Sequence, residues 1–426
     1  MGVTHSWTAP AQHGWQQEPA PIPLTGPLFH SDPQRLYQDM RREQGPVVAV
    51  ELPGGFPAWL VIGYREMHQV TSDPELFPRD VGLWNQWPNI PEDWPLRPMV
   101  GEPRPSIYYT AGAEHRRHLS MVEPALDSVD PFQLRRTCED LADRLIDQFC
   151  GTGHAELVAE YAEPLPVLAL AWILGFANED GPELAWTMKA IADSGADAQQ
   201  ALMEFFGQMQ SLVAANRACP GNNLVSRMLA DPGGFTDEEY MHDLMAITAA
   251  GHLPTSDWIG NSVRLMLTDD RFAAALGGGR HSVGQAMNEV LWEDTPTQIL
   301  SGRWAARDTR LGDKLVRRGD MLLLGLGAAN ADPHVRQHIS GSVEPAYSGN
   351  RAHFAFSHGE YRCPFPAQQI AEIIARTAIE VLIDRLPDID LAVPAETLVR
   401  RPSPFLRGMT SLPVRFTPVR AVGGSR

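Results

Sequence analysis

The pattern of apolar and polar positions divides the chain into a long helical centre flanked by short strand-like segments. Through the centre, apolar residues recur every three to four positions, the period of an α-helix with one buried face. Short runs of β-branched residues bounded by Gly or Pro predict strands near both ends. The pattern predicts a mainly α structure with minor β. Predicted helices cover residues 32–42, 64–72, 114–126, 131–150, 154–175, 181–195, 198–217, 221–230, 236–267, 282–293 and 367–382, and predicted strands cover residues 47–50, 58–62, 302–306, 309–311 and 321–324.

Two helix starts and one long loop stand out in this pattern. Thr236 followed by Glu239, and Ser282 followed by Gln285, predict capping boxes that open the helices after them. The segment 78–110 has no periodicity and is rich in Trp and Pro. A loop this long inside a compact domain is usually functional. Its aromatic side chains either line a binding site or pin the loop to the core.

Composition and charge narrow the class of protein. The 426 residues are 43% hydrophobic and carry a net charge of −17, which argues against nucleic acid as a partner. The four cysteines have no CxxC spacing, as expected in a reducing compartment. Residues 1–27 do not read as a signal peptide, and no run reaches the roughly 20 apolar residues of a membrane span. We expect a cytoplasmic protein with a Pro-rich arm (1–30), one domain (31–420) and a tail (421–426).

Cys363 is the candidate for metal chemistry. Phe356 and Gly359 precede it, and a predicted helix follows it from Ala367. A thiol at a helix start lies at the positive end of the helix dipole, which favours the thiolate. A thiolate in a reducing compartment usually carries a metal. The alternative is a buried, inert cysteine.

The stretch from Phe356 to Cys363 resembles the haem-ligand loop of the cytochrome P450 superfamily, Phe-x-x-Gly-x-x-x-Cys. Three further segments match the superfamily in order and spacing, so the resemblance covers roughly residues 30–420. It implies the cytochrome P450 fold and a b-type haem (heme b) whose iron takes Cys363 as its axial thiolate. It also implies a monomer that binds a small substrate and receives electrons from NAD(P)H through a ferredoxin and its reductase.

The resemblance also implies which side chains hold the haem. His115 matches the histidine that pairs a propionate, and because Leu119 replaces the usual arginine, Arg116, Arg117 or His118 must serve, of which we choose Arg117. Buried carboxylates require such cationic partners. The haem-contacting set is Cys363, His115, Arg117, Arg303, His353, Tyr361, Arg362 and Phe356.

The chain departs from the superfamily on both sides of the expected haem. Ala250 and Gly251 match the oxygen-binding segment of the long helix. Leu253 and Pro254 replace the acid and Thr that deliver protons in the superfamily, and Thr255 is the neighbouring residue that could serve instead. Glu289 is followed by Trp292 instead of Arg, as in a subgroup of actinobacterial relatives, and Ala331 also replaces an Arg. Pro364 and Pro366 next to Cys363 lack an N–H, which predicts fewer donors to the sulfur and a more negative iron potential.

The missing acid and Thr favour radical coupling over oxygen insertion. We therefore predict oxidative C–C or C–N coupling of aromatic substrates in secondary metabolism, such as tryptophan-containing cyclodipeptides. The alternatives are an ordinary monooxygenase that hydroxylates a small natural product with the help of Thr255, a non-catalytic haem sensor or redox protein, and a peroxide-driven enzyme. Catalytic positions are Cys363, Ala250, Gly251 and Thr255, and the predicted substrate contacts are Trp84, Trp87, Tyr109, Pro254, Gln298 and Phe405.

Overall fold

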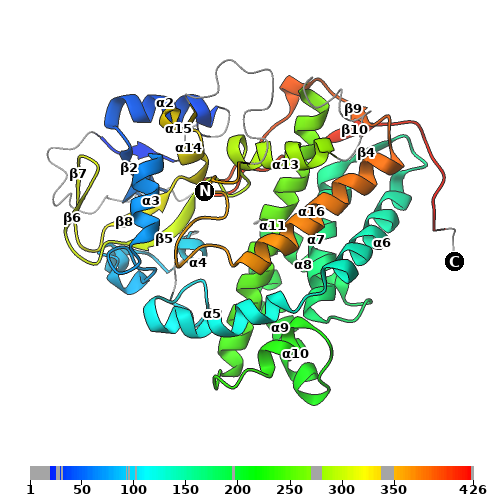
Figure 1. The fold of residues 1–426 in the computed structure, drawn as a ribbon, viewed down its shortest axis with the longest axis horizontal. Coiled ribbons are helices and arrows are strands. Elements are labelled where there is room, and N and C mark those ends of the chain that lie inside the picture. Colours follow the sequence, from blue (N-terminus) through cyan, green and yellow to red (C-terminus); the bar gives the residue numbers. More distant parts are fainter. Residues whose placement is uncertain are drawn as a thin grey trace, which may run out of the picture.

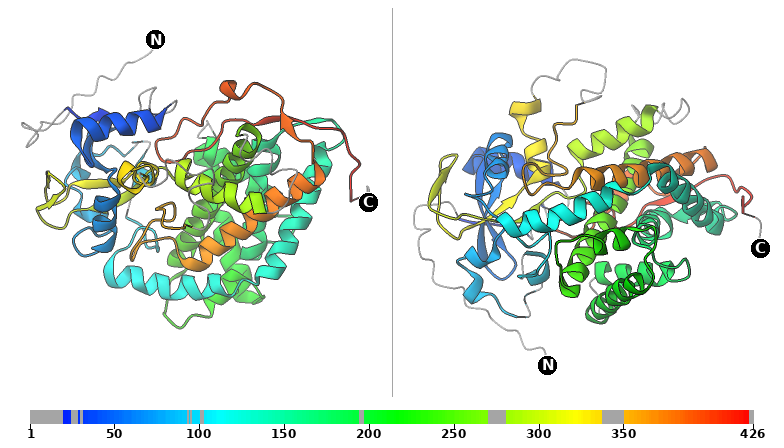
Figure 2. Two further views of the ribbon diagram at one scale, coloured as in Figure 1. Left: turned by 45° about the horizontal axis from the view of Figure 1, so that its top comes forward. Right: turned by 60° about the horizontal axis from the view of Figure 1, so that its bottom comes forward.

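The chain folds into a smaller part rich in strands and a larger helical part. Both views in Figure 2 keep these two parts side by side, with the strand-rich part at the left and the helical part at the right. This computed structural model describes residues 20–24, 29, 32–92, 94, 96–100, 103–193, 197–269, 281–336 and 350–423.

A five-stranded sheet forms the centre of the smaller part. Its order is β1-β2-β3-β8-β5, with β3 parallel to β8 and antiparallel to β2. The runs at residues 47–50 and 58–61 are buried on both faces of the sheet, which is why they read as nearly continuous apolar segments. The strands are β1 (Ile22–Pro23), β2 (Val47–Leu52), β3 (Phe56–Val61), β5 (Leu300–Trp304) and β8 (Met321–Leu324).

The helical part is built around α11 (Asp237–Thr268), which runs through its middle (Figure 1). The capping box at its start is confirmed: Glu239 N–H donates to Thr236 Oγ1, and Thr236 N–H donates to Glu239 Oε2. α11 contacts α7, α9, α13 and α16 directly. The larger helices around it are α5 (Gly112–Asp127), α6 (Pro131–Phe149), α7 (Pro164–Leu174), α8 (Gly181–Asp193), α9 (Ala198–Ala218), α13 (His281–Glu293) and α16 (Phe365–Arg385).

Short elements complete the architecture. The helices are α2 (Pro33–Gln44), α3 (Tyr64–Ser72), α4 (Arg97–Val100), α10 (Leu224–Leu229), α14 (Leu326–Asn330) and α15 (Pro333–Arg336). The strands are β4 (His154–Glu156), β6 (Thr309–Leu311), β7 (Lys314–Val316), β9 (Asp390–Leu391) and β10 (Pro413–Arg415). Among the described residues, no helix is both long and apolar enough to cross a membrane.

The predicted fold class, mainly α with minor β, is confirmed, but one predicted helix is wrong. The range 154–175 contains β4, a π-helical stretch at Val158–Ala162, and then α7. β4 pairs with β10, far along the chain, and Pro164 begins α7 as a separate helix. Residues 1–19 of the predicted arm, residues 424–426 of the tail and the Ser282 side chain lie outside the described residues.

Candidate functional site

Cys363 ends a loop immediately before α16, as predicted. Its backbone N–H donates to the carbonyl of Phe356 at 3.0 Å. Its own carbonyl accepts from Gln368 Nε2, in the first turn of α16, at 2.7 Å. These two bonds hold Cys363 at the positive end of the helix dipole.

The surroundings of the Cys363 sulfur do not stabilise a free thiolate. Burial raises the pKa of the Cys363 thiol to about 12. Pro364 and Pro366 have no N–H, and within the described part of the chain no group donates to Sγ. The α16 dipole alone does not offset this burial, so a bound metal ion would be needed to hold the thiolate at neutral pH. This environment fits a metal ligand.

Two buried arginines lie against the same loop without a carboxylate partner. Arg303, in β5, is fully buried; its Nη1 donates to the Gly302 carbonyl, while Nε and Nη2 have no acceptor. Arg79 donates only to the carbonyls of Tyr108 and Tyr361, each at 3.4 Å. Both guanidinium groups lie over the Tyr361 ring, 4.4 Å and 5.4 Å from its centroid.

Burial lowers the pKa of both guanidinium groups, and each cation repels the other. No carboxylate among the described residues forms an ion pair with Arg303 or Arg79. Buried cations without counter-ions are costly. The pair therefore fits an anionic group, such as the two propionates of a haem. The sequence alone did not indicate Arg79, because it lies in the loop at 78–110 and gains meaning only beside Arg303.

The predicted histidines differ in their availability. His353 Nδ1 is buried without a partner, and burial lowers the pKa of His353 to about 4. His115 has both ring nitrogens near backbone carbonyls, Ile107 at 2.9 Å and Glu360 at 3.3 Å, and its ring contacts Tyr361. His353 is thus the freer of the two to bind a propionate.

Two other predicted haem contacts, Arg117 and Arg362, do not lie with the buried arginines. The Arg117 guanidinium donates to Glu114 and Glu239, so the structure does not bring it to Arg303. The Arg362 side chain is exposed to solvent. Phe356, in contrast, lies beneath α11, with its ring 5.8 Å from that of Trp258.

The segments around the loop are braced without the usual arginines. The buried Trp292 Nε1 donates to the Asn350 carbonyl at 3.0 Å. Asn330, fully buried, donates to the Leu291 carbonyl at 2.9 Å and accepts from the Phe354 N–H at 2.7 Å. Asn330 thus joins α13 to the Cys363 loop. The resemblance implied that Trp292 and Ala331 replace two arginines, but sequence analysis did not identify Asn330 as a brace.

The middle of α11 matches the prediction only in part. Ala250 is exposed on the helix, as expected for a surface that a ligand approaches. A Cβ on Gly251 would lie 3.2 Å from Leu170 of α7, so this glycine permits close packing of α7 on α11, and its role in ligand approach stays a prediction. Pro254 lies inside an uninterrupted α11. Thr255 is buried, and His252 Nε2 lies 3.1 Å from the Glu163 carbonyl.

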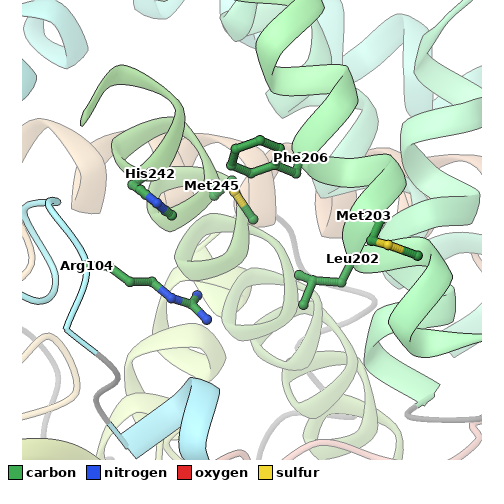
Figure 3. A pocket seen from close by; sticks show the side chains of 6 residues that line it. All are labelled: Arg104, Leu202, Met203, Phe206, His242 and Met245. Carbon is green, nitrogen blue, oxygen red and sulfur yellow. The ribbon is translucent and has the colours of Figure 1, made fainter. Parts of the chain in front are cut away.

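A largely apolar cavity of about 280 Å³ lies between α9, α11 and the segment at Arg104. In Figure 3, Arg104 and His242 lie on one side of it and the side chains of α9 on the other. The six residues that line it are Arg104, Leu202, Met203, Phe206, His242 and Met245.

The predicted substrate contacts do not line this cavity. Trp84 is buried and packs against Trp87 and Trp94, in agreement with the alternative that these rings pin their loop to the core. Phe405 is part of the same core cluster. Gln298 is buried and donates to the carbonyls of Ser403 and Leu406. Tyr109 and Pro254 are partly buried. Of these aromatic residues, Trp84 and Phe405 are buried in the core, whereas Trp87 and Tyr109 are only partly buried.

The sequence and the fold of the chain are similar to those of bacterial cytochrome P450 enzymes. No protein-family model matches it. It is 28% identical to the cytochrome P450 monooxygenase PikC of Streptomyces venezuelae, over 97% of this chain and 98% of that protein. It is 29% identical to a vitamin D(3) 25-hydroxylase of Pseudonocardia autotrophica, over 92% and 95%. The solved structure of CYP154C4 from Streptomyces sp. W2061 is 29% identical and superimposes with a TM-score of 0.82, over 95% of this chain and 99% of that one.

Proposed function

Because the chain belongs to the cytochrome P450 superfamily and is an oxidoreductase of that type, we propose that it is a monooxygenase that oxidises a small, largely apolar substrate of secondary metabolism. The observation that carries the proposal is the pair of buried, unpaired guanidinium groups of Arg303 and Arg79 beside the Cys363 loop. These two cations would pair with the propionates of a haem, whereas an inert cysteine would need no cations beside it.

The haem-binding residues follow from this arrangement. Cys363 Sγ would bind the iron, and Arg303, Arg79 and His353 would hold the propionates. When bound, the haem supplies a thiolate-ligated iron that activates dioxygen. The chain's contribution is to place the cofactor, exclude water and position the substrate. We propose that electrons come from NAD(P)H through a ferredoxin and its reductase.

The cavity indicates the kind of substrate. Leu202, Met203, Phe206 and Met245 give it a flexible apolar wall, and methionine side chains adapt to irregular ligands. Arg104 and His242 offer polar groups that would orient a substrate oxygen. A relative named for its action on vitamin D(3) supports a bulky apolar substrate.

Oxidative aromatic coupling is the second candidate. The observation that favours it is the absence of an acid and a Thr at Leu253 and Pro254, with His252 directed at the Glu163 carbonyl. In coupling, two aromatic molecules, such as tryptophan-containing cyclodipeptides, each lose one hydrogen and join through a new C–C or C–N bond, and the product gains no oxygen. In the monooxygenase, protons would instead arrive through ordered water or a substrate hydroxyl.

Product mass distinguishes the two candidates. The haem-loaded protein, supplied with a ferredoxin and reductase, is incubated with apolar polyketides, sterols and aromatic cyclodipeptides. The monooxygenase predicts a product heavier than the substrate by one oxygen atom, and coupling predicts a product with the mass of two substrate molecules minus two hydrogens. Phe206→Ala should weaken the spectral shift on substrate binding, whereas Phe132→Ala, on the exposed side of α6, should leave it unchanged. Binding and turnover with none of these compounds would contradict both candidates.

A further inference from the structure

A buried histidine joins α5 to α11 at a place separate from the Cys363 loop. His118, on α5, is fully buried, and its Nδ1 lies 2.6 Å from Asp243 Oδ2 on α11. Asp243 Oδ1 also accepts the Ile107 N–H at 2.6 Å, as expected of an ionised carboxylate. An ionised Asp243 accepts from His118 Nδ1–H, which leaves Nε2 as the ring nitrogen that can bind a metal ion.

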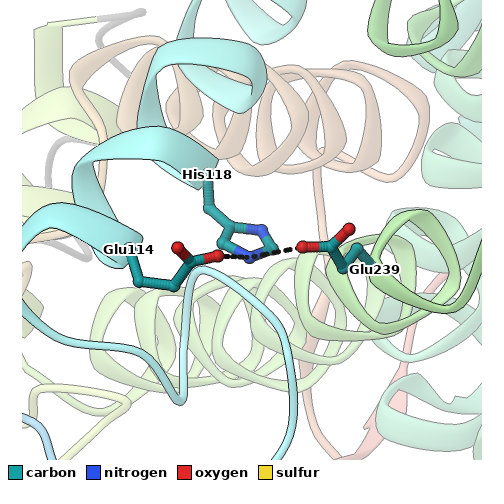
Figure 4. A group of neighbouring side chains, drawn as sticks. All are labelled: Glu114, His118 and Glu239. Atoms are coloured by element: carbon teal, nitrogen blue, oxygen red, sulfur yellow. Dashed lines mark ion pairs between the residues drawn. The ribbon is translucent and has the colours of Figure 1, made fainter. Parts of the chain in front are cut away.

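His118 Nε2 points between two further carboxylates (Figure 4). It lies 3.6 Å from Glu114 Oε1 and 3.8 Å from Glu239 Oε1, and it has no hydrogen-bond partner in the described part of the chain. Glu114 and His118 are four residues apart on α5, hence on one face of the helix. Glu239 comes from the first turn of α11.

The spacing of these three atoms suits a small metal ion. All three lie within 4.8 Å of one another. A tetrahedral Zn²⁺ with bonds of about 2.0–2.2 Å places its ligand atoms roughly 3.3–3.6 Å apart. Nε2 therefore needs to approach each oxygen by only a few tenths of an ångström, and the two glutamate side chains would rotate to bring their oxygens around the ion. Imidazole with carboxylates is a donor set that Zn²⁺ accepts and that Mg²⁺ and Ca²⁺ do not favour.

We propose that Glu114, His118 and Glu239 bind one Zn²⁺ ion, which ties α5 to α11. Asp243 holds the imidazole from behind, as a carboxylate does behind many zinc-binding histidines. Water completes the coordination on the Glu114 side, where the glutamate is half exposed.

Arg117 occupies the same carboxylates and must be displaced by the ion. Its Nη2 donates to Oε1 of both Glu114 and Glu239. Two carboxylates, Glu114 and Glu239, face the single guanidinium of Arg117, and Asp243 lies behind His118, so a negative surplus remains that a divalent cation would neutralise more completely. The Arg117 side chain is partly exposed, so it has a path into solvent, and the ion must compensate for the loss of its ion pairs and of its contact with the Phe235 ring. Arg117 is therefore a competitor of the ion.

The ion would also stabilise the wall of the cavity. α11 carries Glu239 and Asp243 of the cluster, and His242 and Met245 of the cavity. Asp243 holds Ile107, whose carbonyl lies 2.9 Å from His115 Nδ1 beside the Cys363 loop. Zn²⁺ would thus connect α5 and α11 to the segment at Ile107, which lies beside the Cys363 loop.

The test measures Zn²⁺ binding to the haem-loaded protein after removal of bound metal with a chelator. All variants carry Cys219→Ser, because Cys219 is an exposed thiol that would bind Zn²⁺ by itself. We expect one Zn²⁺ per chain by calorimetry and a higher melting temperature with Zn²⁺. Glu114→Gln should weaken binding by roughly tenfold or more, and Arg117→Gln should strengthen it because the competing cation is gone. Asp127→Asn, exposed on the same helix, is the matched control and should bind as the parent does.

X-ray absorption at the zinc edge should show nitrogen and oxygen ligands and no sulfur. Equal affinity of the parent and Glu114→Gln, weaker binding by Arg117→Gln, a sulfur ligand, or no binding would each overturn the proposal. None of these readouts depends on substrate or turnover, so the result is independent of the proposed reaction.

Discussion

Gly359 lets the loop that ends at Cys363 pass directly against α3. Its φ is +74°, and a Cβ there would lie 1.9 Å from the Thr71 carbonyl oxygen. Backbone atoms cannot yield as a flexible side chain can, so the position requires glycine for both conformation and space. The loop motif seen in the sequence is therefore a packing requirement as well as a chemical one.

Gly359→Ala should displace the Cys363 loop, at a cost on the order of 1–3 kcal/mol of stability. We expect poor haem retention after gel filtration and a lower urea midpoint. Gly207→Ala, in α9 with open space around it, is the control and should be neutral or slightly stabilising. Full haem retention in Gly359→Ala would show that the loop does not depend on this contact.

The prolines around Cys363 should set the redox potential of the bound iron. Pro366→Ala restores a backbone N–H in the first turn of α16, close to the sulfur. A new donor stabilises the thiolate charge, so the reduction potential should rise by something on the order of tens of millivolts. A spectroelectrochemical titration measures this directly. An unchanged potential would mean that the added N–H does not reach Sγ.

Asp257 is a buried acid that makes stability depend on pH. Burial raises the pKa of Asp257 to about 7, against the opposing effect of Arg401, 3.4 Å away. The folded state therefore binds a proton more tightly than the unfolded state, where the pKa is about 4. Protonation of Asp257 contributes fully to the free energy of unfolding below about pH 4. This contribution is lost as pH rises to about 7, at up to roughly 1.4 kcal/mol per pH unit.

Asp257→Asn should remove this dependence and should be more stable than the wild type at pH 8. The measurement is the free energy of unfolding of both proteins from pH 5 to pH 8. Parallel curves for the two proteins would contradict the raised pKa.

Among the elements, α13, α14 and the Cys363 loop depend on one shared side chain. Asn330, at the end of α14, bonds to Leu291 in α13 and to Phe354 before Cys363. Removing it leaves a carbonyl and an N–H buried without partners. We infer that the hydrogen bonds of Asn330 provide the bracing that the resemblance assigns to the two arginines, whose positions are taken here by Trp292 and Ala331.

Asn330→Ala should lower the free energy of unfolding by about 2–4 kcal/mol and increase hydrogen exchange at Phe354. Asn89→Ala, at an exposed position, serves as the control and should change neither. Unchanged exchange at Phe354 would show that the loop is held independently of α14.

The success of sequence-based prediction follows the range of the interactions involved. The long helices were predicted well because periodicity and the Thr236–Glu239 box are local. The strand β4 was missed because its partner, β10, lies far along the chain. The roles of Asn330 and Arg79 come from carbonyls and rings brought close only by folding. Trp84 was assigned to substrate on its aromatic residue type, which does not distinguish a binding surface from a core, and it lies in a core cluster.

The molecule as a whole joins a strand-rich part, which supplies Arg303, to a helical part, which supplies α11 and Cys363 (Figure 1). The buried arginines lie where these parts meet the Cys363 loop. An anionic cofactor at this place would neutralise them and join both parts. We therefore expect haem binding to raise the melting temperature of the entire chain.

The most direct test of a haem held by Cys363 is the absorption spectrum of the reduced protein with carbon monoxide. A thiolate-ligated haem predicts a band near about 450 nm. Cys363→Ala should lose this band, while Cys219→Ser, which removes an exposed cysteine, should keep it. Absence of the band from the wild-type protein, or its persistence in Cys363→Ala, would contradict the account.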